Sequence, residues 1–171
     1  MIDLKNPIIL VEKTAEDAVL PIRSEATASG LDVCVQNVVR VYDFMNKEVD
    51  LKKCRVCDNW WVYPGYRYLV DTGLRVAIGI PGYEIQVRSR SGLALKLGLR
   101  VENSPGTIDC DYRGMLGIIL INDSKAVYGI KKHDRIAQIV AAKVELLGVK
   151  EVEALPDSHH RGVGGFGHTG V

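Results

Sequence analysis

Short apolar runs alternate with turn-forming residues along most of the chain. Glycine, proline, aspartate and asparagine separate these runs, which fall at residues 6–12, 31–42, 67–78, 83–89, 115–122, 126–130 and 135–147. Few windows keep a helical period for three turns, whereas β-branched residues recur at the short spacing typical of strands. The pattern therefore predicts an all-β fold, either a barrel or a jelly roll.

Two segments depart from this pattern. Residues 91–99, SGLALKLGL, are expected to form a single short helix. Residues 157–171 contain five glycines and almost no aliphatic side chains, so they cannot pack as a core element. We therefore expect one β-barrel domain at residues 1–155, followed by a flexible glycine-rich segment at 156–171, with no internal repeat and no second-domain linker.

Composition narrows the class of protein. A chain of 171 residues that is 47% hydrophobic and 25% charged is ordinary for a single globular domain. Such a domain buries roughly 70% of its unfolded surface, so it needs neither disulfides nor a metal to fold. The net charge of +1 argues against a nucleic-acid partner. The N-terminus has no signal-peptide pattern, and no apolar run approaches the roughly 20 residues that span a bilayer. We expect a soluble cytoplasmic protein that does not bind membranes.

The stretch 103–114, NSPGTIDCDYRG, carries the most concentrated candidate chemistry. It sets two carboxylates, a tyrosine and an arginine among turn residues, directly before the apolar run 115–122. This order predicts a β-hairpin with Asp109, Asp111 and Tyr112 at the rim of a sheet. The structural alternative is that both aspartates only cap backbone N–H groups in the turn. For Asp111 that alternative is sufficient.

Two further segments have the residue types of a phosphate site. Residues 88–98, RSRSGLALKLG, place arginines and serines before a glycine at the start of the expected helix. In residues 157–171, glycines bracket Arg161, Phe166, His168 and Thr169, which suits a lid that binds phosphate and stacks on a base. Taken alone, each segment has a simpler and more common interpretation, the first as a solvated loop and the second as a flexible terminus.

Together these segments resemble the five motifs of the trimeric deoxyuridine triphosphatase (dUTPase) family, in order. The similar stretches are ASGLDVC at 28–34, RSRSGLA at 88–94, NSPGTIDCDYRG at 103–114, HDRIAQIV at 133–140 and RGVGGFGHTG at 161–170. The resemblance implies the family's distorted jelly-roll β-barrel with a short helix. It also implies a homotrimer in which each active site is built from three subunits, so that a monomer would be inactive.

The resemblance further implies a reaction. The family hydrolyses dUTP to dUMP and diphosphate, which removes dUTP and supplies dUMP for thymidylate synthesis. Asp109 matches the aspartate that orients and activates a water for in-line attack on the α-phosphate. Asp32 matches a supporting residue near the metal–water network. Mg²⁺ would be held chiefly by substrate phosphates and water, with no protein ligand.

The substrate-binding positions follow from the same resemblance. Tyr112 would pack on the deoxyribose and exclude a 2′-hydroxyl, which selects against UTP. The uracil edge would be bound by Asn103 and the adjacent hairpin backbone at Gly106 and Ile108. The remaining matches bind phosphate or close over the substrate: Arg90, Ser91, Gly92, Gln138, Arg161, Phe166, Gly167, His168 and Thr169. Arg161 would meet the γ-phosphate and Phe166 would stack on the uracil. Beside the fourth motif, Asp134 and Arg135 are expected to form a structural ion pair or a subunit contact.

One segment departs from the family pattern. The spacing between the first two motifs is longer than in typical members, with an insertion near residues 44–67 that contains both tryptophans and a CxxC pair, Cys54 and Cys57. Three interpretations stay open: a zinc or redox site, an aromatic hairpin that packs on the barrel with reduced thiols, and a protein-binding patch. A four-ligand zinc site within one chain lacks the further cysteines it would need nearby.

Two alternative functions remain. A dCTP deaminase shares the fold but has a catalytic glutamate after the third motif, where this chain has the aliphatic Ile119. An aliphatic side chain cannot transfer the protons that deamination requires. The other alternative is a protein-binding regulatory module on the same fold. That hypothesis expects loss of Asp109 or of the C-terminal motif, and both are present.

Overall fold

The computed structural model describes residues 8–156 of the chain. Their strands and helices follow one another in this order: β1 (Leu10–Lys13), β2 (Leu31–Cys34), β3 (Asn37–Tyr42), the 3-10 helix η1 (Leu51–Lys53), β4 (Arg55–Val56), β5 (Asn59–Val62), β6 (Arg67–Ala77), β7 (Tyr83–Ser89), α1 (Ser91–Leu97), β8 (Leu99–Val101), β9 (Gly106–Ile108), β10 (Met115–Asn122), β11 (Tyr128–Lys131) and β12 (Arg135–Lys143).

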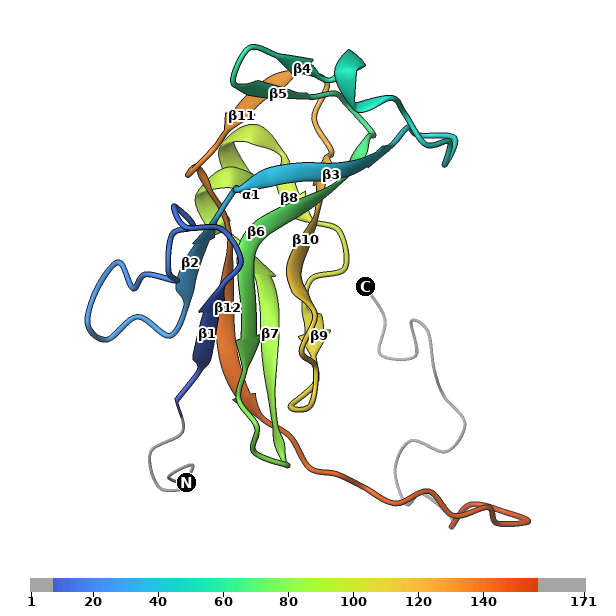
Figure 1. Ribbon diagram of the computed structural model, residues 1–171. Helices are drawn as coiled ribbons and strands as arrows, with labels where there is room; N and C mark the ends of the chain where they lie inside the picture. The colour runs from blue at the N-terminus through green and yellow to red at the C-terminus, as the bar shows by residue number, and fades with distance from the viewer. Residues whose placement is uncertain (1–7, 157–171) are drawn as a thin grey trace.

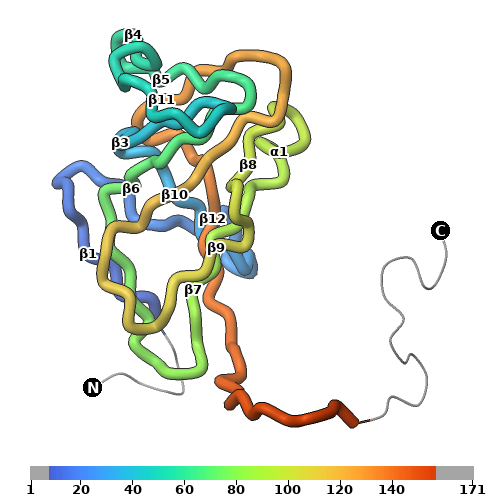
Figure 2. Tube along the Cα trace, turned by 90° about the vertical axis from the view of Figure 1, so that its right-hand side faces the viewer, coloured from blue at the N-terminus to red at the C-terminus, as the bar shows by residue number. Residues whose placement is uncertain are grey.

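The strands form three sheets. The largest has the order β1-β6-β10-β8, with β3 also paired to β6, and the second has the order β2-β12-β7-β9. A small third sheet has the order β11-β5-β4 and lies at one end of the body, at the top of Figure 1. Turning the molecule by 90° keeps this small sheet above the other two (Figure 2).

The long strands are built by alternation of buried and less buried side chains. On β10, Leu116, Ile118 and Leu120 are fully buried, and the antiparallel neighbour β6 buries Val70 and Leu74. These side chains join residues of the second sheet in one hydrophobic cluster. Each such aliphatic side chain stabilises the fold by about 1.5–3 kcal/mol when it leaves water. The core therefore lies between the two larger sheets and fixes their positions relative to each other.

The prediction of a mostly β fold with one short helix is confirmed. The helix α1 ends at Gly98, whose φ of 66° is a left-handed conformation that favours glycine and whose N–H donates to the Ala94 carbonyl. Among the helices of residues 8–156, none is long and apolar enough to cross a membrane.

Two strand predictions need correction. The run 31–42 is two strands, because Val35 N–H donates to the Asp134 carbonyl and Gln36 N–H donates to the Asp71 carbonyl. The chain passes there from the second sheet to the first. The strands that flank residues 103–114, β8 and β10, pair antiparallel as a hairpin requires, but the stretch between them is not a simple turn. Strand β9 pairs with β7, whereas β10 pairs with β6 and β8, so the turn joins two sheets.

The aromatic segment forms a hairpin that packs on the barrel. Strands β4 and β5 pair as Arg55↔Trp60, and the Arg55 guanidinium lies 5.2 Å from the centroid of the Trp60 ring. Trp60, Cys54 and Val62 belong to the main hydrophobic cluster. The hairpin is therefore part of the core and is not an appendage.

Two buried polar side chains fasten this hairpin to the long strands. Tyr68 of β6 donates its hydroxyl to the Trp61 carbonyl at 2.9 Å and accepts from Tyr63 N–H at 3.0 Å. Asn122 of β10 donates its amide to the Val62 carbonyl at 2.8 Å. Both side chains are completely buried. Burial raises the pKa of the Tyr68 hydroxyl above its usual range, so this anchor stays neutral.

The cysteines of the CxxC pair lie apart. Cys54 is buried before β4, and Cys57 is exposed in the turn after β4, with a φ of 53°. Three residues along an extended strand span roughly 10 Å, which exceeds the Cα separation of about 7 Å that a disulfide allows. Within residues 8–156, no group of three or more His, Cys, Asp or Glu side chains is arranged to hold a metal ion. The geometry thus favours the packed-hairpin interpretation over a redox pair.

Candidate active site

A cavity of about 450 Å³ lies where strands β2, β7 and β12 meet the helix α1. It is lined by residues from three separate parts of the sequence: Ser24, Asp32, Arg90, Ser91, Gly92, Leu93, Lys96, Leu97, Arg135 and Gln138. The neighbouring strands explain this meeting, because Gln138 of β12 is paired with Asp32 on one side and Arg88 on the other. The structure therefore brings together the predicted positions of the first, second and fourth motifs.

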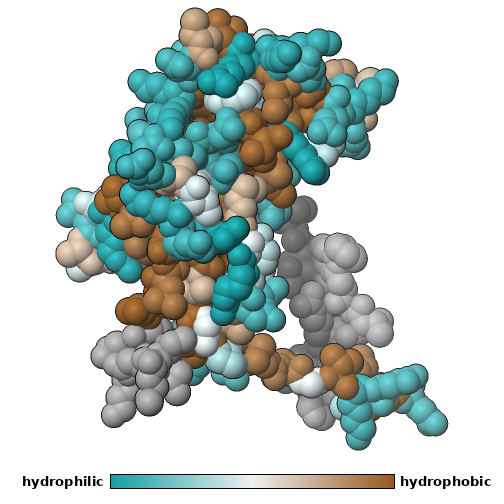
Figure 3. Space-filling model, viewed as in Figure 1, coloured by the Kyte–Doolittle hydropathy of each residue, from teal (hydrophilic) through white to brown (hydrophobic). Residues whose placement is uncertain are grey.

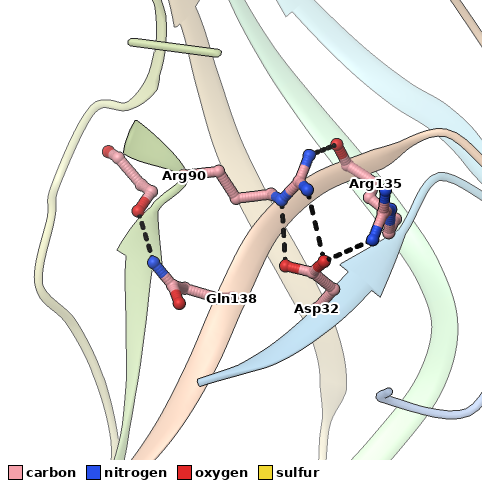
Figure 4. Close-up of polar contacts among 5 residues, drawn as sticks. Asp32, Arg90, Arg135 and Gln138 are labelled. Atoms are coloured by element: carbon pink, nitrogen blue, oxygen red, sulfur yellow. Dashed lines mark hydrogen bonds and ion pairs between the residues drawn. The ribbon is translucent and has the colours of Figure 1, made fainter. Parts of the chain in front are cut away.

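Asp32 is the centre of the polar network in this cavity (Figure 4). Its carboxylate accepts two hydrogen bonds from Arg90, from Nε at 2.9 Å and from Nη2 at 3.2 Å, and one from Arg135 Nη1 at 3.0 Å. Arg90 also donates to the Arg135 carbonyl at 3.0 Å. A planar guanidinium that pairs with a carboxylate through two bonds is held in one orientation. Asp32 thus orients both arginines at the cavity.

This arrangement corrects the expected partner of Arg135. Arg135 pairs with Asp32, and the Asp134 carboxylate instead accepts the backbone N–H of Lys131 at 2.9 Å. Asp134 and Arg135 have different partners because successive side chains on a strand point to opposite faces of the sheet. Asp134 stabilises the turn before β12, while Arg135 belongs to the cavity.

The cavity is positively charged. Arg90, Lys96 and Arg135 contribute three cations to its lining, against the single carboxylate of Asp32. Only one of these cations, Arg90, was predicted from the sequence to bind substrate. Lys96 lies in the last turn of α1, and no motif of the sequence singled it out. An excess of cationic side chains suits an anionic ligand such as a chain of phosphates.

The first residues of α1 leave room beside these charges. Ser91 and Gly92 line the cavity, and a Cβ atom built on Gly92 would have no other atom within 4 Å. A ligand can therefore approach the backbone closely at this point. Beneath the network, burial and then the negative charge of Asp32 raise the pKa of the Cys34 thiol, so that Cys34 stays neutral.

Gln138 lines the cavity and reaches from β12 to β7. Its Nε2 donates to the Ser89 carbonyl at 2.9 Å, which links β12 to the last residue of β7 (Figure 4). A glutamine amide has two hydrogens on nitrogen, so one remains for a ligand after this bond is made. Gln138 can therefore donate to an anion bound in the cavity.

The third-motif residues lie on the β9 strand and the turns at its ends. Asn103 packs on Gly106, with its Nδ2 2.9 Å from a Cβ built there, and Ile108 is nearly buried on β9. Asp109 and Tyr112 are exposed, as the prediction of a rim position requires. The Tyr112 hydroxyl donates to the Met115 carbonyl at 3.0 Å, which folds the ring over Gly114.

Within one chain, Asp109 is well separated from the cavity. Asp32 lies on β2 and Asp109 follows β9, at the opposite edges of the sheet β2-β12-β7-β9. Three strand spacings amount to roughly 14 Å, and the rows of Arg88 and Ile85 on β7 differ by roughly 10 Å along the strands. The cavity of one chain therefore lacks the predicted catalytic aspartate. The remaining predicted site residues, Arg161, Phe166, Gly167, His168 and Thr169, lie outside the described residues.

Comparison with known proteins gives a consistent result. Residues 49–170 match the family model described as dUTPase. The deoxyuridine 5′-triphosphate nucleotidohydrolase of Hydrogenobaculum sp. is 44% identical over 165 residues, covering 95% of this chain and 98% of that protein. The nucleotidohydrolase of the same name from Nautilia profundicola is 40% identical over 161 residues, covering 94% and 96% of the two chains.

Solved structures agree on the fold. The dUTPase of Staphylococcus bacteriophage 80alpha, solved with dUPNHPP, is 26% identical and superposes with a TM-score of 0.75, covering 96% of this chain and 99% of that chain. A mutant dUTPase of phage phi11 of S. aureus, whose structure shows the coordination of a structural Mg(II) ion, superposes with a TM-score of 0.67. It is 23% identical and covers 86% of this chain and 98% of that chain. The chain therefore belongs to the dUTPase family of deoxyuridine 5′-triphosphate nucleotidohydrolases.

Proposed function

We propose that this chain hydrolyses dUTP to dUMP and diphosphate at a site that combines the cavity of one subunit with the third-motif turn of another. The observation that carries this proposal is the positively charged cavity in which Asp32, Arg90, Ser91, Gly92 and Gln138 meet. Family membership identifies the substrate. The reaction would remove dUTP and supply dUMP for thymidylate synthesis, and its cytoplasmic location stays a prediction.

The cavity would bind the triphosphate. Arg90, already oriented by Asp32, would donate to phosphate oxygens, and the Ser91 hydroxyl and the backbone at Gly92 would approach the same chain. The free amide hydrogen of Gln138 would reach the α-phosphate. These contacts would align the α-phosphorus for in-line attack. The entropy of orientation would then be lost on binding and not in the chemical step.

The third-motif turn would supply the base and the selectivity. Asp109 would accept a hydrogen bond from a water and orient it toward the α-phosphorus. Tyr112 would pack against the deoxyribose and leave no room for a 2′-hydroxyl. Asn103 and the backbone of Gly106 and Ile108 would pair with the uracil edge, and mispairing would reject cytosine. We propose that Arg161 and Phe166 of the C-terminal motif, with Gly167, His168 and Thr169, close over this complex.

The residues present fit a Mg²⁺ ion carried mainly by the substrate. Within the described residues, the cavity offers one carboxylate, Asp32, and both of its oxygens already accept from arginines. The phosphate oxygens and water are then the principal ligands, with Asp32 near the water shell. When bound, Mg²⁺ supplies positive charge that offsets the charge developing on the phosphates.

The apolar extension after β12 supports a homotrimer. Residues 144–156 leave the body of the subunit without joining a sheet (Figures 1 and 2). Leu146, Leu147 and Leu155 are 75%, 84% and 84% exposed on this segment. Exposed apolar side chains that gather on one segment commonly mark a contact with another protein. A neighbouring copy would cover them and bring its own third-motif turn near the cavity.

Two alternatives are tested together with this proposal. Ile119, at the position of the deaminase glutamate, lies with Tyr42 and Leu69 around a different, apolar cavity. The residues that line it, Arg40, Tyr42, Asn46, Arg67, Leu69 and Ile119, include no carboxylate to take the place of that glutamate. A protein partner at residues 44–67 stays a prediction, and Phe44 and Met45 are exposed on that segment.

The decisive experiment measures diphosphate release from dUTP, dCTP, dTTP and UTP with Mg²⁺, followed by identification of the nucleotide product. We expect turnover of dUTP alone, with dUMP as product. The variant Asp109→Asn should still bind dUPNHPP but lose roughly 100- to 10,000-fold in kcat, because the amide keeps the shape and removes the base. Asp111→Asn, in the same exposed turn, is the matched control and should stay active.

The outcomes separate the alternatives. Deamination of dCTP would contradict the hydrolase assignment. A folded protein with no turnover on any of the four nucleotides would favour the regulatory module. Unchanged turnover by Asp109→Asn would refute the water-activation role while leaving the substrate assignment intact.

A further inference from the structure

Gly30 lies immediately before β2, on the same side of the sheet as Asp32 and Gln138. In the antiparallel pairing of β2 with β12, Gln138 is opposite Asp32 and Ile139 is opposite Leu31. Gly30 is therefore a diagonal neighbour of Gln138, since residues two apart on a strand share a face. A side chain on residue 30 would project toward the Gln138 amide.

The space beside Gly30 is already filled by that amide. A Cβ built on Gly30 would lie 2.0 Å from Gln138 Oε1 and 3.0 Å from Gln138 Cδ. These separations are far shorter than a van der Waals contact of about 3.5–4.0 Å between heavy atoms. The absence of a side chain at residue 30 is what lets the amide oxygen occupy its observed position.

Backbone conformation does not explain the glycine. Gly30 is not among the glycines with a positive φ, which are Gly65, Gly73, Gly79, Gly82 and Gly98. A positive φ therefore does not require a glycine there, and the three atoms nearest to the added Cβ all belong to the Gln138 side chain. The atom that must yield is the far end of a flexible side chain, which can move by rotating.

That rotation would break the hydrogen bond that orients the Gln138 amide. The amide extends from the Gly30 side toward β7, where Nε2 donates to the Ser89 carbonyl. Displacing Oε1 also turns Nε2 away from Ser89 and redirects the second amide hydrogen. We propose that Gly30 is a positioning residue for the hydrolysis: its missing side chain seats the Gln138 amide so that the amide hydrogen meets the α-phosphate. This inference rests on the proposed function of Gln138.

The test is a double-mutant cycle on the full-length protein. Gly30→Ala, Gln138→Ala and the double variant are compared with the parent in dUTP hydrolysis, with kcat and KM measured separately and dUPNHPP used as the binding probe. Gly129→Ala is the matched control, because the atoms nearest to a Cβ there belong to the Trp61 ring and lie at 3.4 Å or more.

We expect Gly30→Ala to lower kcat/KM at least about 10-fold with an unchanged unfolding midpoint, and Gly129→Ala to match the parent. In the Gln138→Ala background, the alanine at residue 30 should have no further effect, because the conflicting amide is gone. Additive losses, or parental kinetics of Gly30→Ala, would overturn the proposal.

A crystal structure of Gly30→Ala provides a readout that is independent of turnover. The Gln138 Nε2 to Ser89 carbonyl bond should be broken, and an intact bond would refute the positioning role. If Gly30→Ala folds poorly, Gln138→Ala should restore its stability, and failure to do so would also refute the role. Parental kinetics of Gln138→Ala itself would instead show that the proposed phosphate contact of Gln138 is wrong.

Discussion

A single carboxylate organises the charged side chains of the cavity. Asp32 is mostly shielded from solvent, with 13% of its side chain exposed, and it accepts hydrogen bonds from both Arg90 and Arg135. Removing one partner of such a pair leaves the other charges without compensation. The sequence similarity suggested only a supporting role near metal-bound water, and the geometry adds the orientation of two guanidinium groups.

Tyr112 allows a test of sugar selection at the scale of one residue. Its exposed ring folds back on Gly114 through the hydroxyl bond to the Met115 carbonyl. Replacing Tyr112 by alanine should raise kcat/KM for UTP relative to dUTP at least about 10-fold, because the ring no longer fills the space of a 2′-hydroxyl. Steady-state kinetics with both nucleotides measure the ratio.

Tyr112→Phe is the control for that experiment. It keeps the ring and removes only the bond to Met115, so the UTP/dUTP ratio should stay low. If Tyr112→Ala discriminates as well as the parent, the sugar is selected elsewhere.

The thiols of the CxxC pair should differ in reactivity. Burial raises the pKa of Cys54 above its ordinary value of 9.0, so Cys54 stays a neutral thiol as pH rises to that value. Cys57 is exposed. With iodoacetamide at pH 8, we expect alkylation at Cys57 and protection of Cys54 in the folded protein, measured by peptide mass spectrometry.

Unfolding the protein provides the control, since both thiols should then react. Equal labelling of the two cysteines in the folded state would contradict the observed burial. A disulfide between them in the folded protein would contradict their separation along β4.

At the scale of elements, the hairpin β4–β5 depends on anchors from the long strands. The Tyr68 hydroxyl satisfies both the Trp61 carbonyl and the Tyr63 N–H in a fully buried position. Tyr68→Phe should lower the free energy of unfolding by about 1–3 kcal/mol, because both backbone groups lose their partner without gaining water. Urea denaturation measures the change.

A matched control is Tyr83→Phe. Tyr83 is only partly buried, so loss of its hydroxyl should change stability by less than about 0.5 kcal/mol. Equal effects of the two substitutions would show that the Tyr68 bonds do not stabilise the hairpin.

Sequence patterns predicted elements better than their pairing. The runs 67–78, 83–89 and 115–122 correspond closely to β6, β7 and β10, because alternation of apolar residues reports directly on a half-buried strand. The partners of β9 and β10 depend on contacts distant in sequence, and a local turn signal could not show that they join different sheets. For the same reason, the break after Cys34 was missed.

The sequence predicted those residues of the candidate site that belong to a recognisable motif. Asp32, Arg90 and Gln138 meet in the cavity as the resemblance implied. Of the two roles expected for Asp134 and Arg135, an ion pair between them is not what the structure shows, because β12 runs beside β2 and Arg135 pairs with Asp32. Lys96 was missed because a single lysine on a short helix has no distinguishing signal.

At the scale of the whole molecule, the site residues that the resemblance implied lie in separate places on one chain. The face in Figure 3 mixes polar and apolar residues, with apolar side chains also on the extension after β12. Asp32, in the positively charged cavity, and the Asp109 turn lie at opposite edges of one sheet. Closed cyclic assemblies bring such separate surfaces together at each interface.

Subunit mixing tests this arrangement. Asp109→Asn and Arg90→Ala should each be nearly inactive alone. When the two proteins are unfolded and refolded together in equal amounts, roughly one site in four would combine an intact turn with an intact cavity from different subunits. We therefore expect activity near one quarter of the parent, measured as dUMP formation.

Separate refolding of each variant before mixing is the control and should give no recovery, provided that subunits do not exchange. If the mixed sample is as inactive as the two variants, both halves of the site come from one chain. Analytical ultracentrifugation of the parent then identifies its assembly.

The anchoring of the small sheet also bears on protein engineering. Residues 51–62 are contiguous, which makes them look like a cassette that could be deleted to shorten the protein. Yet β11, far along the chain, has β5 as its paired neighbour, and Asn122 and Tyr68 place their polar groups against the same hairpin. Deletion would leave β11 with an unpaired edge that promotes self-association. It would also leave Asn122 and Tyr68 without hydrogen-bond partners for their buried polar groups. A shortened, folded version of this protein would therefore need β11, Asn122 and Tyr68 to be redesigned together.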